Sequence, residues 1–124
     1  SMQFTTETMQ ASIGQTWAVF MISDQSPSNV KDAHWLPFFG HETAFLHGLE
    51  KHARAYNYPV FYFNVKRIKR GQYDVTAHLL ADKPAELAPS ELTRRYATML
   101  EACIRADPAA WLWSHNRWKR KKLV

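Results

Sequence analysis

Residues 59–80 read Pro-Val-Phe-Tyr-Phe-Asn-Val-Lys-Arg-Ile-Lys-Arg-Gly-Gln-Tyr-Asp-Val-Thr-Ala-His-Leu-Leu, and this stretch decides the fold class. Its first part, Pro59–Ile68, is rich in aromatic and β-branched residues and predicts a strand. Gly71 and Gln72 predict a turn. Tyr73–Leu80 then alternates between apolar and polar residues, as a half-exposed antiparallel partner does. The stretch therefore predicts two strands that pair with each other.

The residues before this pair predict a further strand and a helix. Trp17–Ser23 is an unbroken apolar run, typical of a strand buried on both faces of a parallel sheet. A loop rich in Ser, Asn and Pro runs from there to about Gly40. Thr43 is expected to cap a helix through Asn57, because apolar residues recur there at helical spacing. The strand–helix–strand order indicates a right-handed crossover.

The residues after the pair predict helices. Ser90 precedes Glu91 as a capping serine followed by an acid in the first turn, and Asp107-Pro108 ends that helix and begins another. Thr5–Ile13 is weakly helical. The predicted fold class is α/β, a small mixed sheet with a βαββ core, part parallel, and flanking helices. We expect a single domain over residues 1–124.

The positive charge is concentrated at the C-terminus. The chain has 124 residues and a formal net charge of +5, with 16 basic and 11 acidic side chains. Residues 117–124 hold five of the basic residues and no acid, and form a basic tail. A second basic run lies at residues 66–70. Such patches favour anionic lipid headgroups or nucleic acid, although a merely solvated tail is an equally ordinary interpretation.

No cofactor or metal ion is expected from the motifs. The six histidines show no metal-ligand spacing, since His47 and His52 are five apart and do not share a helical face. The single cysteine excludes an internal disulfide. No nucleophile-elbow, Walker or dinucleotide glycine pattern is present. No apolar run reaches the roughly 18 residues that span a bilayer.

The C-terminal motif Ala110–Lys119 contains three of the five tryptophans. Indole rings combine a large apolar area with one polar edge. We expect Trp111 and Trp113 to pack the last helix against the sheet. Trp118 lies among cations, an arrangement typical of a membrane interface.

Several motifs taken together resemble one family. They are, in chain order, Ile22-Ser23-Asp24-Gln25, Pro37-Phe38-Phe39-Gly40, Gly48-Leu49 with Ala53, Tyr58-Pro59-Val60, Gly71-x-Tyr73, Glu91-x4-Tyr96 with Leu100-Glu101 and Ile104-Arg105, and Pro108-x2-Trp111-Leu112-Trp113-Ser114-His115-x-Arg117-Trp118-Lys119. This pattern resembles the bacterial lipid A biosynthesis lauroyl/myristoyl acyltransferases, within the glycerolipid acyltransferase superfamily. The resemblance covers Trp17 to Lys119.

The resemblance implies a reaction and a place for it. Such enzymes transfer a fatty acyl group from an acyl thioester, on acyl carrier protein or CoA, to a hydroxyl of a lipid acceptor. They work at the cytoplasmic face of the inner membrane. Their catalytic signature is a histidine followed, after four residues, by Asp or Glu, where the acid orients the imidazole as general base.

This chain departs from that signature. The residues five positions after its six histidines are not acidic; they are Phe39, Leu46, His52, Asn57, Lys83 and Arg120. We therefore expect no catalytic residue in this chain. The resemblance implies a C-terminal portion of a longer acyltransferase, whose base lies upstream and which is inactive without it.

The matching motifs supply the candidate site residues. The resemblance implies that acceptor-pocket residues are Asp24, Gln25, Phe38, Phe39 and Gly40. Arg117 is expected to pair with phosphate, since arginine offers bidentate donors. Membrane or phosphate contacts are expected from Trp118, Lys119, Arg120, Lys121 and Lys122. For Asp24, pinning of its own loop is an equally weighted alternative.

A second hypothesis is that the chain is a binding protein and takes no part in catalysis. It is a stand-alone binding module that attaches to anionic lipid headgroups through the basic, tryptophan-rich C-terminus. Nucleic acid is not expected as a partner, because the aromatic residues form no stacking platform. Under either hypothesis, an unpaired sheet edge would favour a homo-oligomer.

Overall fold

The computed structural model describes residues 2–122, with side chains from residue 7 onward. The last two residues of the predicted basic tail, Leu123 and Val124, lie outside this range. The elements are α1 (Met2–Ala11), β1 (His34–Phe38), β2 (His41–Phe45), α2 (Gly48–Tyr56), β3 (Val60–Lys69), β4 (Gln72–Ala81), η1 (Pro84–Glu86), α3 (Glu91–Ala106) and η2 (Pro108–Ala110). The predicted α/β class is confirmed.

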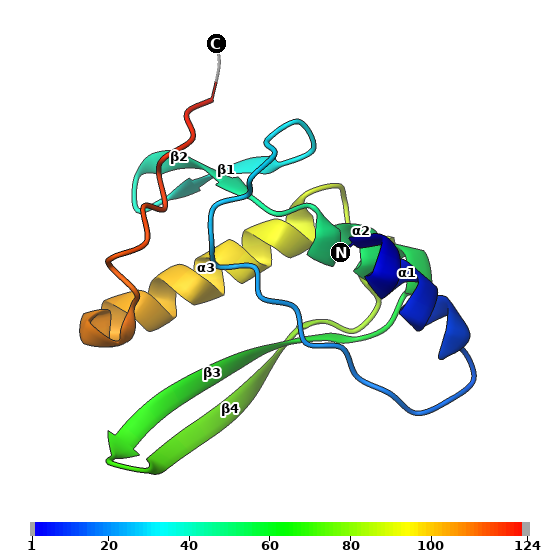
Figure 1. Cartoon of the computed structure of the whole chain (residues 1–124), viewed down its shortest axis with the longest axis horizontal. Coiled ribbons are helices and arrows are strands. Elements are labelled where there is room, and N and C mark those ends of the chain that lie inside the picture. The colour runs from blue at the N-terminus through cyan, green and yellow to red at the C-terminus, as the bar shows by residue number, and fades with distance from the viewer. Residues whose placement is uncertain (1, 123–124) are drawn as a thin grey trace.

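The strands form two antiparallel pairs, β1 with β2 and β3 with β4. The β3–β4 hairpin matches the two strands predicted over residues 59–80, and it projects away from the rest of the molecule (Figure 1). Its turn contains Gly71 at a φ of 75°, which glycine adopts without steric cost. Within the part of the chain that the structure describes, neither sheet contains a parallel pair.

The prediction of a strand at Trp17–Ser23 is wrong. The segment has no regular secondary structure and joins neither sheet. Phe20 and Ile22 are 78% and 80% exposed, whereas a strand buried on both faces has neighbours on each side. The segment makes a side-chain contact with β3, where the ring centroids of Phe20 and Phe63 lie 5.5 Å apart.

A hairpin replaces the predicted loop and helix start near Gly40. Strands β1 and β2 are joined by Phe39 and Gly40, which both have positive φ, 50° and 76°. A two-residue loop with this backbone matches the twist of the flanking strands. Thr43 therefore lies in β2 and is buried, and the helix α2 begins only at Gly48.

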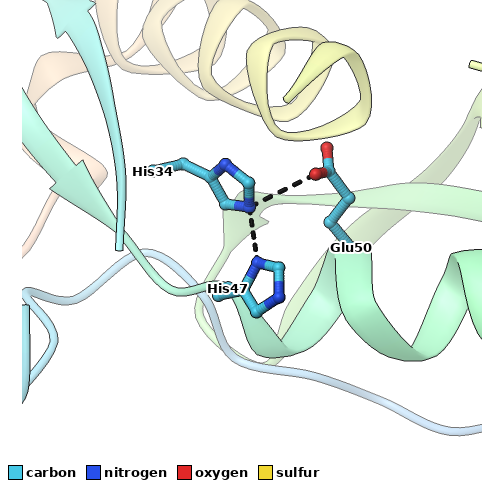
Figure 2. Close-up of side chains that lie close together, drawn as sticks. All are labelled: His34, His47 and Glu50. Atoms are coloured by element: carbon cyan, nitrogen blue, oxygen red, sulfur yellow. Dashed lines mark hydrogen bonds and ion pairs between the residues drawn. The ribbon is translucent and has the colours of Figure 1, made fainter. Parts of the chain in front are cut away.

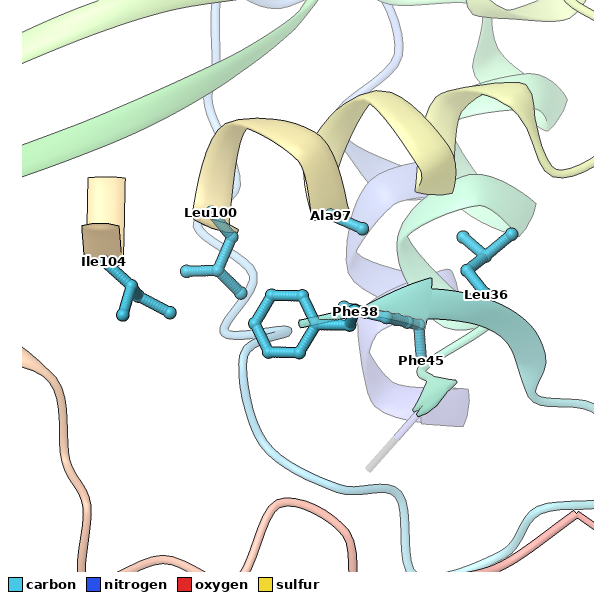
Figure 3. Packing of buried hydrophobic residues seen from close by; sticks show 6 residues of the cluster. All are labelled: Leu36, Phe38, Phe45, Ala97, Leu100 and Ile104. Carbon is cyan, nitrogen blue, oxygen red and sulfur yellow. The ribbon is translucent and has the colours of Figure 1, made fainter. Parts of the chain in front are cut away.

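The main core lies between the β1–β2 hairpin and α3. Figure 3 shows the facing side chains, with Leu36, Phe38 and Phe45 on the hairpin and Ala97, Leu100 and Ile104 on α3. Full burial of each large apolar side chain contributes roughly 1.5–3 kcal/mol. A second cluster joins α2, β4 and the first turn of α3; it comprises Ala53, Leu80, Ala81 and Leu92. Helix α3 is therefore the element that both clusters share.

Helix α3 begins at Glu91 as predicted, but Ser90 does not cap it. Ser90 has a φ of 68° and its hydroxyl makes no capping hydrogen bond. The carboxylate of Glu50, on α2, accepts hydrogen bonds from the backbone N–H groups of Ser90 (3.0 Å) and Thr93 (3.2 Å) instead. A negative charge here also suits the helix dipole. The further helix predicted after α3 is the short 3-10 turn η2.

Candidate functional site

Three of the predicted motifs meet in the folded chain. The backbone N–H of Ser26 donates a hydrogen bond to His115 Nε2 at 3.1 Å. Trp118 Nε1 donates to Thr43 Oγ1 at 2.9 Å. The first bond joins the loop after Asp24 to the tryptophan motif, and the second joins that motif to the β1–β2 hairpin. The motifs are therefore close in space although up to 89 residues separate the bonded partners.

Arg117 is the buried charge at this junction. Its side chain is 2% exposed, and its guanidinium carbon lies 4.5 Å from the ring centroid of Phe45 and 5.9 Å from that of Phe38. None of its side-chain nitrogens has a hydrogen-bond partner among the described residues. Burial lowers the pKa of Arg117 to about 10, while the nearby Tyr96 and Asp24 oppose this effect. Such a buried, unpaired cation is a strong potential anion binder.

Asp24 lies within electrostatic range of Arg117. Its Oδ1 is buried without a hydrogen-bond partner in the described part of the chain. Burial raises the pKa of Tyr62 and of Tyr96 well above the usual range, and the charge of Asp24 adds to both increases. Gln25, its predicted companion, is exposed. The structure therefore brings Asp24 and Arg117 to one place and leaves Gln25 at the surface.

The Phe38-Phe39-Gly40 motif forms the turn and inner face of the hairpin. Phe38 belongs to the core. Phe39 donates its backbone N–H to Glu101 Oε1 at 3.0 Å, and the guanidinium of Arg105 lies 4.7 Å from its ring centroid. These contacts from α3 hold Phe39 in a left-handed conformation that non-glycine residues rarely adopt. Its assignment to an acceptor pocket stays a prediction.

An apolar cleft opens next to Asp24. It has a volume of about 760 Å³ and lies between residues 15–24, α2, β3 and the middle of α3. Exposed side chains that line it include Phe20, Ile22, Phe61 and Phe63. This volume and a mostly apolar lining are typical of small-molecule binding sites. Asp24 lines it too, so the cleft is apolar along its length and has a carboxylate in its wall.

The packing of the three C-terminal tryptophans agrees only in part with the prediction from the sequence. Trp111 packs against the core as predicted, but Trp113 is 59% exposed, so its predicted packing role is wrong. Trp118 is half-buried against Phe38, with ring centroids 6.2 Å apart. Trp118 therefore fastens the C-terminal segment to the hairpin.

The cations after Trp118 remain at the surface. Lys119, Arg120, Lys121 and Lys122 are all exposed. Arg120 donates to the backbone carbonyl of Ser28 at 3.2 Å, and Lys122 lies 3.6 Å from Glu42. Exposed pairs of this kind hold the segment weakly. No helix among the described residues is long and apolar enough to cross a membrane.

Sequence spacing missed a polar cluster at the start of α2. His34 Nε2 lies 2.7 Å from His47 Nδ1 and 3.2 Å from Glu50 Oε2 (Figure 2). Burial lowers the pKa of His34, and His47 adds to this effect while Glu50 opposes it. The cluster depends on a contact between β1 and α2, and no local spacing rule reports such a contact.

The comparisons with known proteins bear on the whole site. A family model described as bacterial lipid A biosynthesis acyltransferase matches residues 6–120. Searches of curated proteins and of solved structures each returned no match. The matched range contains the cleft, Asp24 and Arg117, and it covers nearly the whole chain. The chain therefore belongs to the bacterial lipid A biosynthesis acyltransferase family.

Proposed function

We propose that this chain is the substrate-binding, C-terminal portion of a longer acyltransferase. That enzyme transfers a fatty acyl group from an acyl thioester, on acyl carrier protein or CoA, to a hydroxyl of a lipid acceptor. It works at the cytoplasmic face of the bacterial inner membrane. The observation that carries the proposal is the apolar cleft beside Asp24 and the buried, unpaired Arg117.

The cleft suits a fatty acyl chain. Phe20, Ile22, Phe61 and Phe63 offer apolar surface that is otherwise exposed to water. Burial of hydrocarbon contributes about 0.8 kcal/mol for each CH₂ group. A chain of a dozen carbons therefore binds mainly through these side chains, and the acyl group is the part of the substrate that the cleft recognises.

Arg117 suits the phosphate of a lipid acceptor. A guanidinium in a site of low dielectric offers paired N–H donors to a phosphate. Since Arg117 is buried, the acceptor must displace some of the residues around it. The residues beyond Trp118 can move most easily, because their contacts, Arg120–Ser28 and Lys122–Glu42, are exposed and individually weak. Binding of the acceptor would thus exchange weak surface pairs for a strong buried one.

One face of the β3–β4 hairpin is apolar and exposed, as expected if another part of the full enzyme covers it. Phe61, Phe63 and Val65 of β3 pair with Leu79, Ala77 and Val75 of β4, and all six are exposed. Phe61 and Phe63 also line the cleft, so a part that covered this face would lie beside the bound acyl chain. A continuous apolar face of this kind marks an interaction site. We assign it to the upstream part of the enzyme. That part would supply the His-x4-Asp/Glu base, which no histidine of this chain provides, and which deprotonates the acceptor hydroxyl.

A second candidate function has its own supporting observation. Lys119 and Lys121 are exposed in the C-terminal segment, and the tip of the β3–β4 hairpin carries exposed cations at residues 66, 67, 69 and 70. Cations near a membrane surface contribute about 1 kcal/mol each to anionic-lipid binding. This favours a non-catalytic module for anionic headgroups.

Binding measurements with matched variants separate the two functions. The ligands are a bisphosphorylated, acylated disaccharide lipid and vesicles of anionic phospholipid, and the variants are Arg117→Met and Arg120→Met. The proposed function predicts that Arg117→Met weakens disaccharide-lipid binding at least about 10-fold more than Arg120→Met. Equal effects of the two variants, with similar affinity for both lipids, would favour the headgroup-binding module instead.

A further inference from the structure

His34, His47 and Glu50 place three metal-ligating atoms around one point. His34 Nε2 lies 2.7 Å from His47 Nδ1 and 3.2 Å from Glu50 Oε2, and all three atoms lie within 4.8 Å of one another. His34 comes from β1, His47 precedes α2, and Glu50 lies in its first turn (Figure 2). We infer that these side chains form a binding site for a divalent transition-metal ion, with zinc as the best fit. This inference is independent of the proposed acyl transfer.

The side chains behind the cluster hold two of the ligands in place. His34 Nδ1 is hydrogen-bonded to Ser90 Oγ at 2.7 Å, which leaves Nε2 directed at the cluster. Glu50 Oε2 accepts from the backbone N–H of Ser90, and Oε1 accepts from both the N–H and the hydroxyl of Thr93. Hydrogen bonds of this kind orient metal ligands and set the histidine tautomer.

The distances are close to those of a zinc site. Zinc binds histidine nitrogen and carboxylate oxygen at about 2.0–2.2 Å in tetrahedral geometry, so its ligand atoms lie roughly 3.3 Å apart. The 3.2 Å between His34 and Glu50 already fits. The 2.7 Å between His34 and His47 must widen by about 0.6 Å to reach that spacing. His47 is free to make this adjustment, because its ring is half-buried and has no other hydrogen bond among the described residues.

The donor set selects the class of ion. Two imidazole nitrogens and one carboxylate suit zinc and its neighbours, whereas magnesium and calcium prefer oxygen ligands throughout. Three protein ligands leave a fourth position for water or an added ligand. Because Glu50 also caps α3, an ion here would join β1, α2 and the first turn of α3.

Calorimetric titration of Zn²⁺ into the purified chain, previously stripped with EDTA, tests the site. One ion should bind per chain. Removal of a ligand in His47→Ala should weaken binding by at least about 10-fold, as loss of even a supporting hydrogen bond does. The matched control is His78→Ala, which removes a half-buried histidine on β4 and should leave the affinity unchanged.

Two results of the Zn²⁺ titration would overturn the site. One is the absence of saturable Zn²⁺ binding by the unaltered chain, and the other is equal affinity in His47→Ala and His78→Ala. Co²⁺ provides a readout that needs no variant, because a tetrahedral ion absorbs visible light strongly. A weak, octahedral Co²⁺ spectrum would also contradict the site. If His47→Ala does not fold by circular dichroism, His34→Asn replaces it, since its amide stands close to the position of Nδ1, which bonds Ser90, and the change removes Nε2.

Discussion

The guanidinium of Arg117 lies over the ring of Phe45, with 4.5 Å between its central carbon and the ring centroid. Phe45 belongs to the main core, so the arginine of the tryptophan motif reaches the centre of the domain. A cation over an aromatic ring recovers part of the cost of burial, about 2 kcal/mol when the cation is desolvated. It does not replace the missing hydrogen bonds. Folding alone therefore gives little reason for a charge at this position.

The first prediction is that Arg117→Met retains full stability. Arg117 makes no hydrogen bond among the described residues, so an apolar side chain of similar length removes the cost of burying an unpaired charge and breaks no hydrogen bond. Urea denaturation of the purified chain measures the difference. Arg117→Lys is the control, since it keeps the charge but loses the planar stack on Phe45. A loss of more than about 2 kcal/mol in Arg117→Met would mean that the arginine is needed for folding.

The second prediction concerns the cap that α2 provides for α3. Glu50→Ala removes the acceptor for the backbone N–H groups of Ser90, which is half-buried, and of Thr93, which is buried. Each unsatisfied group costs about 1–3 kcal/mol, so the free energy of unfolding should fall by roughly 2–6 kcal/mol. Glu91→Ala, which removes only partly exposed pairs with Arg94 and Arg95 in the same turn, should change it by no more than about 1 kcal/mol. Similar losses in both variants would contradict the capping role.

The third prediction concerns the bond that fastens the C-terminal segment. Trp118→Phe keeps an aromatic ring but loses the hydrogen bond to Thr43 Oγ1, and should destabilise the chain by about 1 kcal/mol. Thr43→Val should cost a similar amount, and the double variant should cost less than the sum of the two. Thermal unfolding measures all three. Strict additivity would show that the two side chains do not interact in solution.

The fourth prediction concerns the uncovered face of the β3–β4 hairpin. We expect the isolated chain to self-associate through this face, because contiguous exposed apolar patches mark interaction sites or cause aggregation. Val75→Lys places a charge on the face, while Thr76→Lys adds the same charge on the opposite side of β4. Sedimentation velocity should show a shift toward monomer in Val75→Lys alone. An identical distribution in both variants would exclude this face as the contact.

The hairpin β3–β4 and the helix α3 were predictable because their signals are local. β-Branched and aromatic residues fill β3, Gly71 supplies the turn, and proline after Asp107 ends α3. The β1–β2 hairpin was not predictable in the same way. Its turn holds Phe39 at a positive φ, and the contacts with Glu101 and Arg105 that favour this conformation come from α3, about 60 residues later.

The same distinction between local signals and contacts of distant elements applies to the candidate site. Asp24 and Arg117 were identified from motifs that resemble a family, and the fold places them within electrostatic range of each other. The cluster of His34, His47 and Glu50 was missed, because its members lie on separate elements. The apolar run at Trp17–Ser23 was misread as a strand, since composition alone does not reveal whether a hydrogen-bonded neighbour exists.

Acyl transfer itself tests the central claim most directly. The measurement is the transfer of a radiolabelled lauroyl group from acyl carrier protein to a lipid A precursor. It compares residues 1–124 with the same chain extended upstream in its native reading frame. We predict product with the extended protein, no product above background with residues 1–124, and a loss of at least about 10-fold when the extended protein carries Arg117→Met. Robust transfer by residues 1–124 alone, or no transfer by the extended protein, would contradict the account.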